Sequence, residues 1–380
     1  MELLPYTEAH HEFRGRLKDF IAKEVTPCVD QWEKDRIVPK HIWRQMGQNG
    51  FLCPDVGPEY GGLGGDFLHS LIVTEEISHT FHTGLAAALH SDIVVPYITA
   101  FASEELKQKY IPGCVSGKTI TAIAMTEPDA GSDLAGMQTI AEEQGNEVVI
   151  NGSKTFISNG INADLLILAA RDPSVENPYQ AISLYLIESG TPGFDRGRHL
   201  DKMGWWSQDT AELFFSNCVI PVSNRIGEKG MGFLMLMEKL QQERLMCAIG
   251  ALVAAERITE WIARYCRETT VRGKPLSKSQ ATQFALVEMA ADVKIGRAFI
   301  EKLIVEHMEK QNIIVETSMA KFWATDMAHR IADRSIDLCG DFGTIEKCPM
   351  ARAWRDIRVT SIFAGTNEIM KGIAAKFMGL

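Results

Sequence analysis

A carboxylate stands on the apolar side of a predicted helix between residues 233 and 254. Glu243 falls in a stripe of apolar positions that recur in steps of three and four, which is typical of one buried helical face. The stripe consists of Phe233, Leu236, Leu240, Cys247, Gly250 and Ala254. A buried carboxylate is costly unless it is paired, hydrogen-bonded or protonated. Glu243 is therefore either an ion-pair partner of Arg244 or of a neighbouring helix, or a general base beside a pocket.

A second carboxylate has similar apolar surroundings. Asp92 lies between apolar residues and shortly before Pro96, in a stretch of about 84–101 that is predicted to be helical. One interpretation is a polar side chain that is hydrogen-bonded to a helix end. The other is a second carboxylate in the pocket of Glu243. The spacing does not decide between them.

Two loops carry groups that suit a flat polar ligand. The segment 125–133, Met-Thr-Glu-Pro-Asp-Ala-Gly-Ser-Asp, follows a predicted strand, and 154–160 reads Lys-Thr-Phe-Ile-Ser-Asn-Gly. Their hydroxyls and the backbone N–H groups of the turns can hydrogen-bond the edge of a planar heterocycle without adding charge.

The elements that must position these groups change in type along the chain. Helical patterns extend to about residue 118, short β-rich runs separated by turns fill 119–226, and long helical patterns return at about 229–268, 279–310, 315–339 and 366–378. We therefore predict an α+β multi-domain fold. It has an N-terminal helical domain (1–118), a middle antiparallel β-domain (119–226) and a C-terminal four-helix bundle (227–380).

Composition excludes several classes of protein. The chain has 39 Lys and Arg against 49 Asp and Glu, a net charge of −10, which argues against a nucleic-acid binder. Its eight cysteines form no Cys-x-x-Cys pair, so we expect neither a metal site nor a disulfide framework, and scattered thiols suit a reducing cytoplasm. No apolar run is long enough to predict a membrane span.

Five ordered motifs resemble the acyl-CoA dehydrogenase family over nearly the full length of the chain. They are Met-Thr-Glu-Pro-x-Ala-Gly-Ser-Asp (125–133), Lys-x-Phe-Ile-Ser-Asn (154–159), Asp-Thr-Ala-Glu-Leu (209–213), Gln-Glu-Arg-Leu (242–245) and Gly-Thr-Asn-Glu-Ile (365–369). The resemblance implies FAD held between the β-domain and the bundle, an acyl-CoA substrate, a homotetramer, and electron transfer to an electron-transferring flavoprotein.

The resemblance also implies roles for single residues. Three would contact the flavin or the part of the substrate near the thioester, three would lie against the flavin ring, and three would approach FAD from the start of the last helix, whose N-terminus suits a phosphate or ribose oxygen. These groups are Met125, Thr126 and Ser132; Phe156, Ile157 and Ser158; and Thr366, Asn367 and Glu368. For Ser158 and Thr366, helix or turn capping is the alternative role.

The family's usual base is a Glu directly before the Gly-Thr of the last motif, where this chain has Ala364. A methyl group cannot remove a proton. Two branches that this chain resembles, the long-chain and isovaleryl types, place the Glu on a bundle helix just before an Arg, which matches Glu243 and Arg244. The resemblance therefore implies that Glu243 is the base and that Arg244 orients it or binds substrate. Asp92 resembles the pocket base of the cyclohexane- and cyclohexene-carbonyl-CoA dehydrogenases.

One departure concerns the neighbouring subunit's FAD. The family usually has Arg-x-x-Phe-Gly where this chain reads Thr-Thr-Val-Arg-Gly (269–273), so we expect Arg272 to supply the missing positive charge. The predicted function is FAD-dependent α,β-desaturation of an acyl-CoA. The alternatives are an alicyclic acyl-CoA dehydrogenase that uses Asp92, a dehydrogenase of carrier-protein-bound acyl groups, and a catalytically silent flavoprotein.

Overall fold

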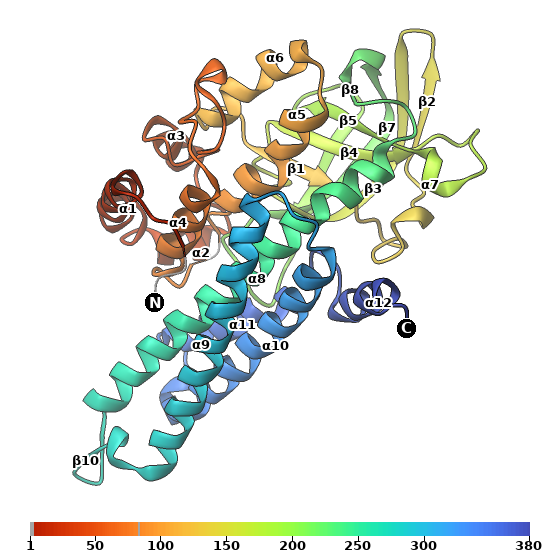
Figure 1. The fold of residues 1–380 in the computed structure, drawn as a ribbon. Helices are drawn as coiled ribbons and strands as arrows, with labels where there is room; N and C mark the ends of the chain where they lie inside the picture. Colours follow the sequence, from red (N-terminus) through yellow and green to blue (C-terminus); the bar gives the residue numbers. More distant parts are fainter. Residues whose placement is uncertain (1–3, 83) are drawn as a thin grey trace.

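Helices, then strands, then helices follow one another along the chain in the computed structural model, which describes residues 4–82 and 84–380 (Figure 1). This order confirms the predicted fold class. The N-terminal part also contains short π-helical turns at Ile21–Val25 and Leu89–Val94. Its α-helices are α1 (Glu8–Phe20), α2 (Val29–Asp35), α3 (Lys40–Gln48), α4 (Phe67–Ser78), α5 (Val95–Phe101) and α6 (Glu104–Val115).

The middle part is one sheet with the strand order β6-β7-β3-β2-β4-β5-β8, to which β1 adds by pairing with β4. The strands are β1 (Thr121–Ala124), β2 (Ile140–Gln144), β3 (Glu147–Ser158), β4 (Leu165–Arg171), β5 (Ile182–Glu188), β6 (Phe194–His199), β7 (Thr210–Pro221) and β8 (Arg225–Ile226). The long ladders are antiparallel, but β1 runs parallel to β4. The β2–β3 hairpin supplies the crossover connection that a parallel pair needs.

The C-terminal part is built on three long helices. They are α8 (Gly232–Glu268), α9 (Gln280–Met308) and α10 (Ile314–Cys339), followed by α11 (Pro349–Ile357) and α12 (Asn367–Phe377). The start of α8 packs in one apolar core with the N-terminal helices and the sheet, through Met235 and Leu236. From Leu245 onward α8 packs in the core of the bundle. Glu243 thus lies where α8 passes from one core to the other.

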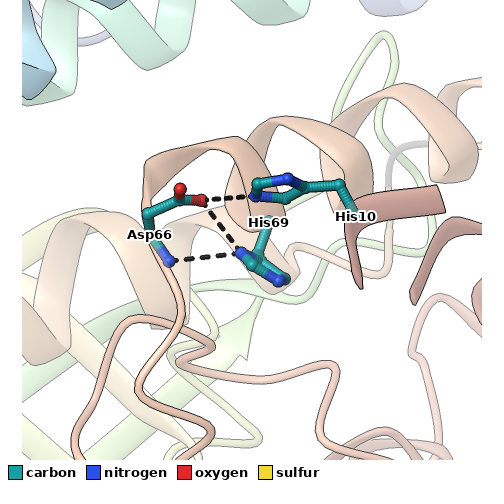
Figure 2. A group of neighbouring side chains, drawn as sticks. All are labelled: His10, Asp66 and His69. Carbon is teal, nitrogen blue, oxygen red and sulfur yellow. Dashed lines mark hydrogen bonds and ion pairs between the residues drawn. The ribbon is translucent and has the colours of Figure 1, made fainter. Parts of the chain in front are cut away.

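The N-termini of α1 and α4 are tied together by three polar side chains (Figure 2). Oδ1 of Asp66 lies 2.9 Å from Nε2 of His10 and 2.9 Å from Nδ1 of His69. The backbone N–H groups of Thr7 and Asp66 reach Nδ1 of the same two rings, so the histidines cap both helices. Among the described residues, this group could also offer a metal three ligand atoms, but the positive helix ends oppose a cation there.

No helix in the described part of the chain is both long and apolar enough to cross a bilayer.

Candidate active site

Glu243 is held by a single neutral donor. Its side chain is buried in α8, and the Tyr97 hydroxyl of α5 donates to its Oε1 at 2.7 Å. Burial raises the pKa of Glu243 to about 7, and the Tyr97 hydroxyl and the Arg244 charge only partly oppose that rise. The Arg244 charge favours the charged form of Glu243, but residues adjacent on a helix do not face each other, and the described residues show no ion pair between these two. The predicted pairing with Arg244 stays a prediction.

Asp92 is buried on the π-helical turn Leu89–Val94, a kind of turn that is frequent at functional sites. Burial raises its pKa to about 8; the Ser70 hydroxyl opposes the shift and the Asp55 carboxylate adds to it. Pro96 has no N–H to offer the Asp92 carbonyl four residues before it. Instead Nε2 of Gln242 donates to that carbonyl at 2.7 Å. This hydrogen bond joins the π-helical turn that carries Asp92 to helix α8, which carries Glu243.

Arg244 follows Glu243 in α8, is buried, and has an N–H donor without a partner among the described residues. Burial lowers its pKa, although the Glu243 and Cys247 side chains oppose the shift. Its Nε is buried and has no hydrogen-bond partner within the described residues. An unpartnered buried guanidinium costs free energy that a bound ligand with an acceptor oxygen would recover. Arg244 is thus suited to hold a polar group of the substrate.

The two loops predicted to hold a flat ligand are brought together by strand β3. Nζ of Lys154 donates to the Met125 carbonyl at 2.9 Å, and the Thr155 N–H donates to the Thr126 carbonyl at 2.9 Å. The same ammonium lies 2.8 Å from Oε1 of Glu127. Oε1 and Oε2 of Glu127 also accept from the backbone N–H groups of Thr139 and Gln138, respectively. This buried pair fixes the start of the loop, whereas Ser132 lies further along it and is exposed.

Phe156 offers a flat apolar face next to that loop. Its ring is 67% exposed, and the residue has a φ of 56° at a register shift between β3 and β7. Ile157 points the other way, into the core of the sheet, and Ser158 is half-buried opposite Thr210. An exposed aromatic ring beside hydroxyl groups fits a planar heterocycle such as the flavin of FAD.

The start of α12 is engaged within the bundle. Oγ1 of Thr366 accepts from the Ile369 N–H at 3.3 Å, which is the capping role. Asn367 is buried: its Oδ1 accepts from Lys321 Nζ at 3.0 Å, and its Nδ2 donates to Asp326 at 2.8 Å. Of the three residues predicted here, Glu368 is the exposed one, and its carboxylate is hydrogen-bonded at the start of the helix, to its own backbone and to Thr366.

Comparisons with known proteins agree with this arrangement. Models of the acyl-CoA dehydrogenase N-terminal, middle and C-terminal domains match residues 7–118, 122–218 and 230–379. The chain belongs to the acyl-CoA dehydrogenase family. It is 39% identical to the long-chain specific mitochondrial enzyme of Rattus norvegicus over 98% of this chain and 86% of that one.

Solved structures show the same likeness. An acyl-CoA dehydrogenase from Geobacillus kaustophilus is 48% identical, with a TM-score of 0.97 over 99% of both chains. A chain described as the FAD complex of PigA is 25% identical, with a TM-score of 0.92 over 100% of both. The protein is therefore an oxidoreductase of a family whose cofactor is FAD.

Arg272 lies far from the rest of the site in this acyl-CoA dehydrogenase. It is exposed at the turn between β9 (Thr270–Val271) and β10 (Lys274–Pro275), beyond the end of the 37-residue helix α8 (Figure 1). At ~1.5 Å per residue that helix is roughly 55 Å long, and Glu243 lies in its other half. The predicted contact of Arg272 with FAD stays a prediction.

Sequence reasoning missed the residues that hold the candidate groups in place. Tyr97 contacts Glu243 across 146 residues of sequence, and nothing local marks it. Gln242 is part of the Gln-Glu-Arg-Leu motif (242–245), but the sequence predicted no role for it. Lys154 did have a signal: the period of two along β3 places it on the same inward face as Val148 and Ile150.

Proposed function

We propose that this acyl-CoA dehydrogenase desaturates an acyl-CoA thioester between its α- and β-carbons, with Glu243 as the base. The observation that carries the proposal is a buried carboxylate that one hydroxyl holds and that forms no ion pair among the described residues, so that burial raises its pKa to about 7. A base is most useful when its pKa is close to the working pH. Structural carboxylates of the same burial are usually paired with a cation.

In this proposal Glu243 takes the proton from the α-carbon, and the electron pair of that C–H bond becomes the new double bond. When bound, FAD supplies the acceptor for the hydride that leaves the β-carbon. The flavin ring would be held by Met125, Thr126, Phe156 and Ser158. Other parts of FAD or of the substrate would be bound by Ser132 and Glu368. Arg244 would donate to an acceptor oxygen of the substrate.

Asp92 supports a second candidate function. Burial raises its pKa to about 8, and the Gln242 side chain of α8 holds its backbone carbonyl. An acid at that place is unfavourable beside a plain alkyl tail. It suits a base acting further along a ring, as in cyclohexane- or cyclohex-1-ene-carbonyl-CoA.

The test is anaerobic bleaching of the flavin band by straight, branched and cyclic acyl-CoAs and by a carrier-protein-loaded acyl group. We expect a CoA ester to bleach the native enzyme and Glu243→Gln to abolish that bleaching. If only cyclic esters react, and Asp92→Asn is the inactive variant, Asp92 is the base. Reaction of the carrier-loaded group alone would mean a carrier-protein enzyme. No bleaching by any of them would leave a silent flavoprotein.

We also propose a homotetramer that passes electrons to an electron-transferring flavoprotein in the cytoplasm. Helix α9 supports association, because Phe284, Val287 and Ile295 are all more than half exposed on it. An apolar hollow of about 490 Å³ lies between α9, α10 and α12. The free cysteines suit a reducing compartment. Light scattering and reduction of the purified acceptor flavoprotein test the first two statements.

A further inference from the structure

We infer that Tyr97 is a positioning residue for the base: it fixes one oxygen of Glu243 and leaves the other to take the substrate's proton. The inference rests on the proposed role of Glu243. It concerns a residue that carries no chemistry of its own and that lies on a different helix from the base.

The contact is short, buried and built from two elements. Tyr97 is fully buried near the start of α5, directly after Pro96, and its hydroxyl donates to Oε1 of Glu243 at 2.7 Å. In the described part of the chain no hydrogen bond reaches Oε2. A carboxylate held at one oxygen on a rigid helix keeps its other oxygen in a fixed direction, which is what proton transfer at a set distance needs.

The surroundings of Glu243 single out this hydroxyl. Arg244 and Cys247 lie on α8 itself, Asp92 is joined to α8 through its backbone carbonyl, and Lys321 of α10 acts on Cys247 rather than on Glu243. Among these groups, the Tyr97 hydrogen bond is the largest influence that favours the charged form of Glu243.

A neutral donor suits a base better than a cation does. A hydroxyl that donates to a buried carboxylate stabilises its charged form, so removing it should raise the carboxylate's pKa by about one to two units. A cation in the same place would lower the pKa further and weaken the base. Tyr97 thus keeps Glu243 in place while leaving it basic.

The experiment is the pH dependence of flavin reduction at saturating acyl-CoA. Because Glu243 must be deprotonated to act, the native rate should rise through a pH near 7. Tyr97→Phe should move that limb up by about one to two pH units, with roughly tenfold or more slower reduction at pH 6, and should also lower the plateau above the limb, because the carboxylate is no longer held in a fixed direction. A packing defect elsewhere would lower the plateau and leave the midpoint of the limb in place.

Tyr185→Phe is the matched control, because Tyr185 is a buried tyrosine of β5 that lies in the core of the sheet rather than beside Glu243. We expect its profile to be native. The inference is overturned if the pH at which flavin reduction rises does not move in Tyr97→Phe. It is also overturned if that pH moves equally in Tyr185→Phe, or if it moves only in Asp92→Asn. Failure of the native enzyme to react with any ester is a different result and would reject the proposed function itself.

Discussion

Two glutamates of this chain are equally buried and differ in almost everything else. Glu127 and Glu243 each expose 4% of their surface. Glu127 faces the Lys154 ammonium and two backbone N–H groups, and these partners lower its pKa below the ordinary value despite its burial. Glu243 has one hydroxyl, and its pKa rises to about 7.

The difference teaches that burial alone does not mark a catalytic acid. Three donors, one of them charged, make Glu127 a permanent anion that fixes the loop 125–133. A single neutral donor leaves Glu243 able to gain and lose a proton near neutral pH. The number and charge of the donors thus separate Glu127 from Glu243, the base that we propose.

The largest expected effect comes from breaking the structural pair. Lys154→Met leaves Glu127 buried without its cation, which should lower the free energy of unfolding by about 3–5 kcal/mol. Urea unfolding followed by circular dichroism measures it. Lys229→Met is the matched control, because Lys229 pairs with Asp172 at 2.7 Å but is 41% exposed, and it should cost less than about 1 kcal/mol. Equal losses in both variants would remove the contrast.

A second, smaller effect has opposite signs at the two glutamates. The pKa of Glu243 is higher in the folded protein than its ordinary 4.5, so its contribution to stability falls as pH rises from about 4.5 to about 7. Glu243→Gln should therefore be more stable than the native protein at pH 8, by about 2–3 kcal/mol.

Glu127 has a lowered pKa. It adds stability above its unfolded pKa and loses that contribution as pH falls through its folded pKa. Glu127→Gln should be less stable than native at pH 7, with the difference shrinking in acid. Thermal unfolding of both variants between pH 4 and pH 8 gives the two slopes. Slopes of the same sign would contradict the comparison.

The smallest effect concerns the cation that Glu243 does have nearby. Arg244 is adjacent in sequence and forms no ion pair with it, so Arg244→Gln should move the acid limb of flavin reduction by less than one pH unit. The profile is measured at saturating substrate, since Arg244 is also our candidate for substrate binding. A shift as large as that of Tyr97→Phe would make Arg244 a partner of the base after all.

The fold class could be predicted because the hydrophobic period changes where helices give way to strands. Glu243 and Asp92 could be predicted because each interrupts an apolar pattern, which is a local signal. Tyr97 and Gln242 could not, because their contacts join helices about 150 residues apart in sequence. The short helix α11 was missed because it has no long periodic pattern, although Pro349 begins α11 as proline often begins helices.

The order in which Pro96 and Gln242 are substituted matters for stability. The proline withholds an N–H from the Asp92 carbonyl, and the glutamine amide covers that carbonyl. Substituting Gln242 first would leave the buried Asp92 carbonyl without the hydrogen bond from the Gln242 amide. Substituting Pro96 first would offer that carbonyl a backbone N–H, so that a later loss of the amide would cost little free energy. The order of the two substitutions therefore changes the free-energy cost of the first step. This contact between the π-helical turn and α8 can change in evolution far more easily in one order than in the other.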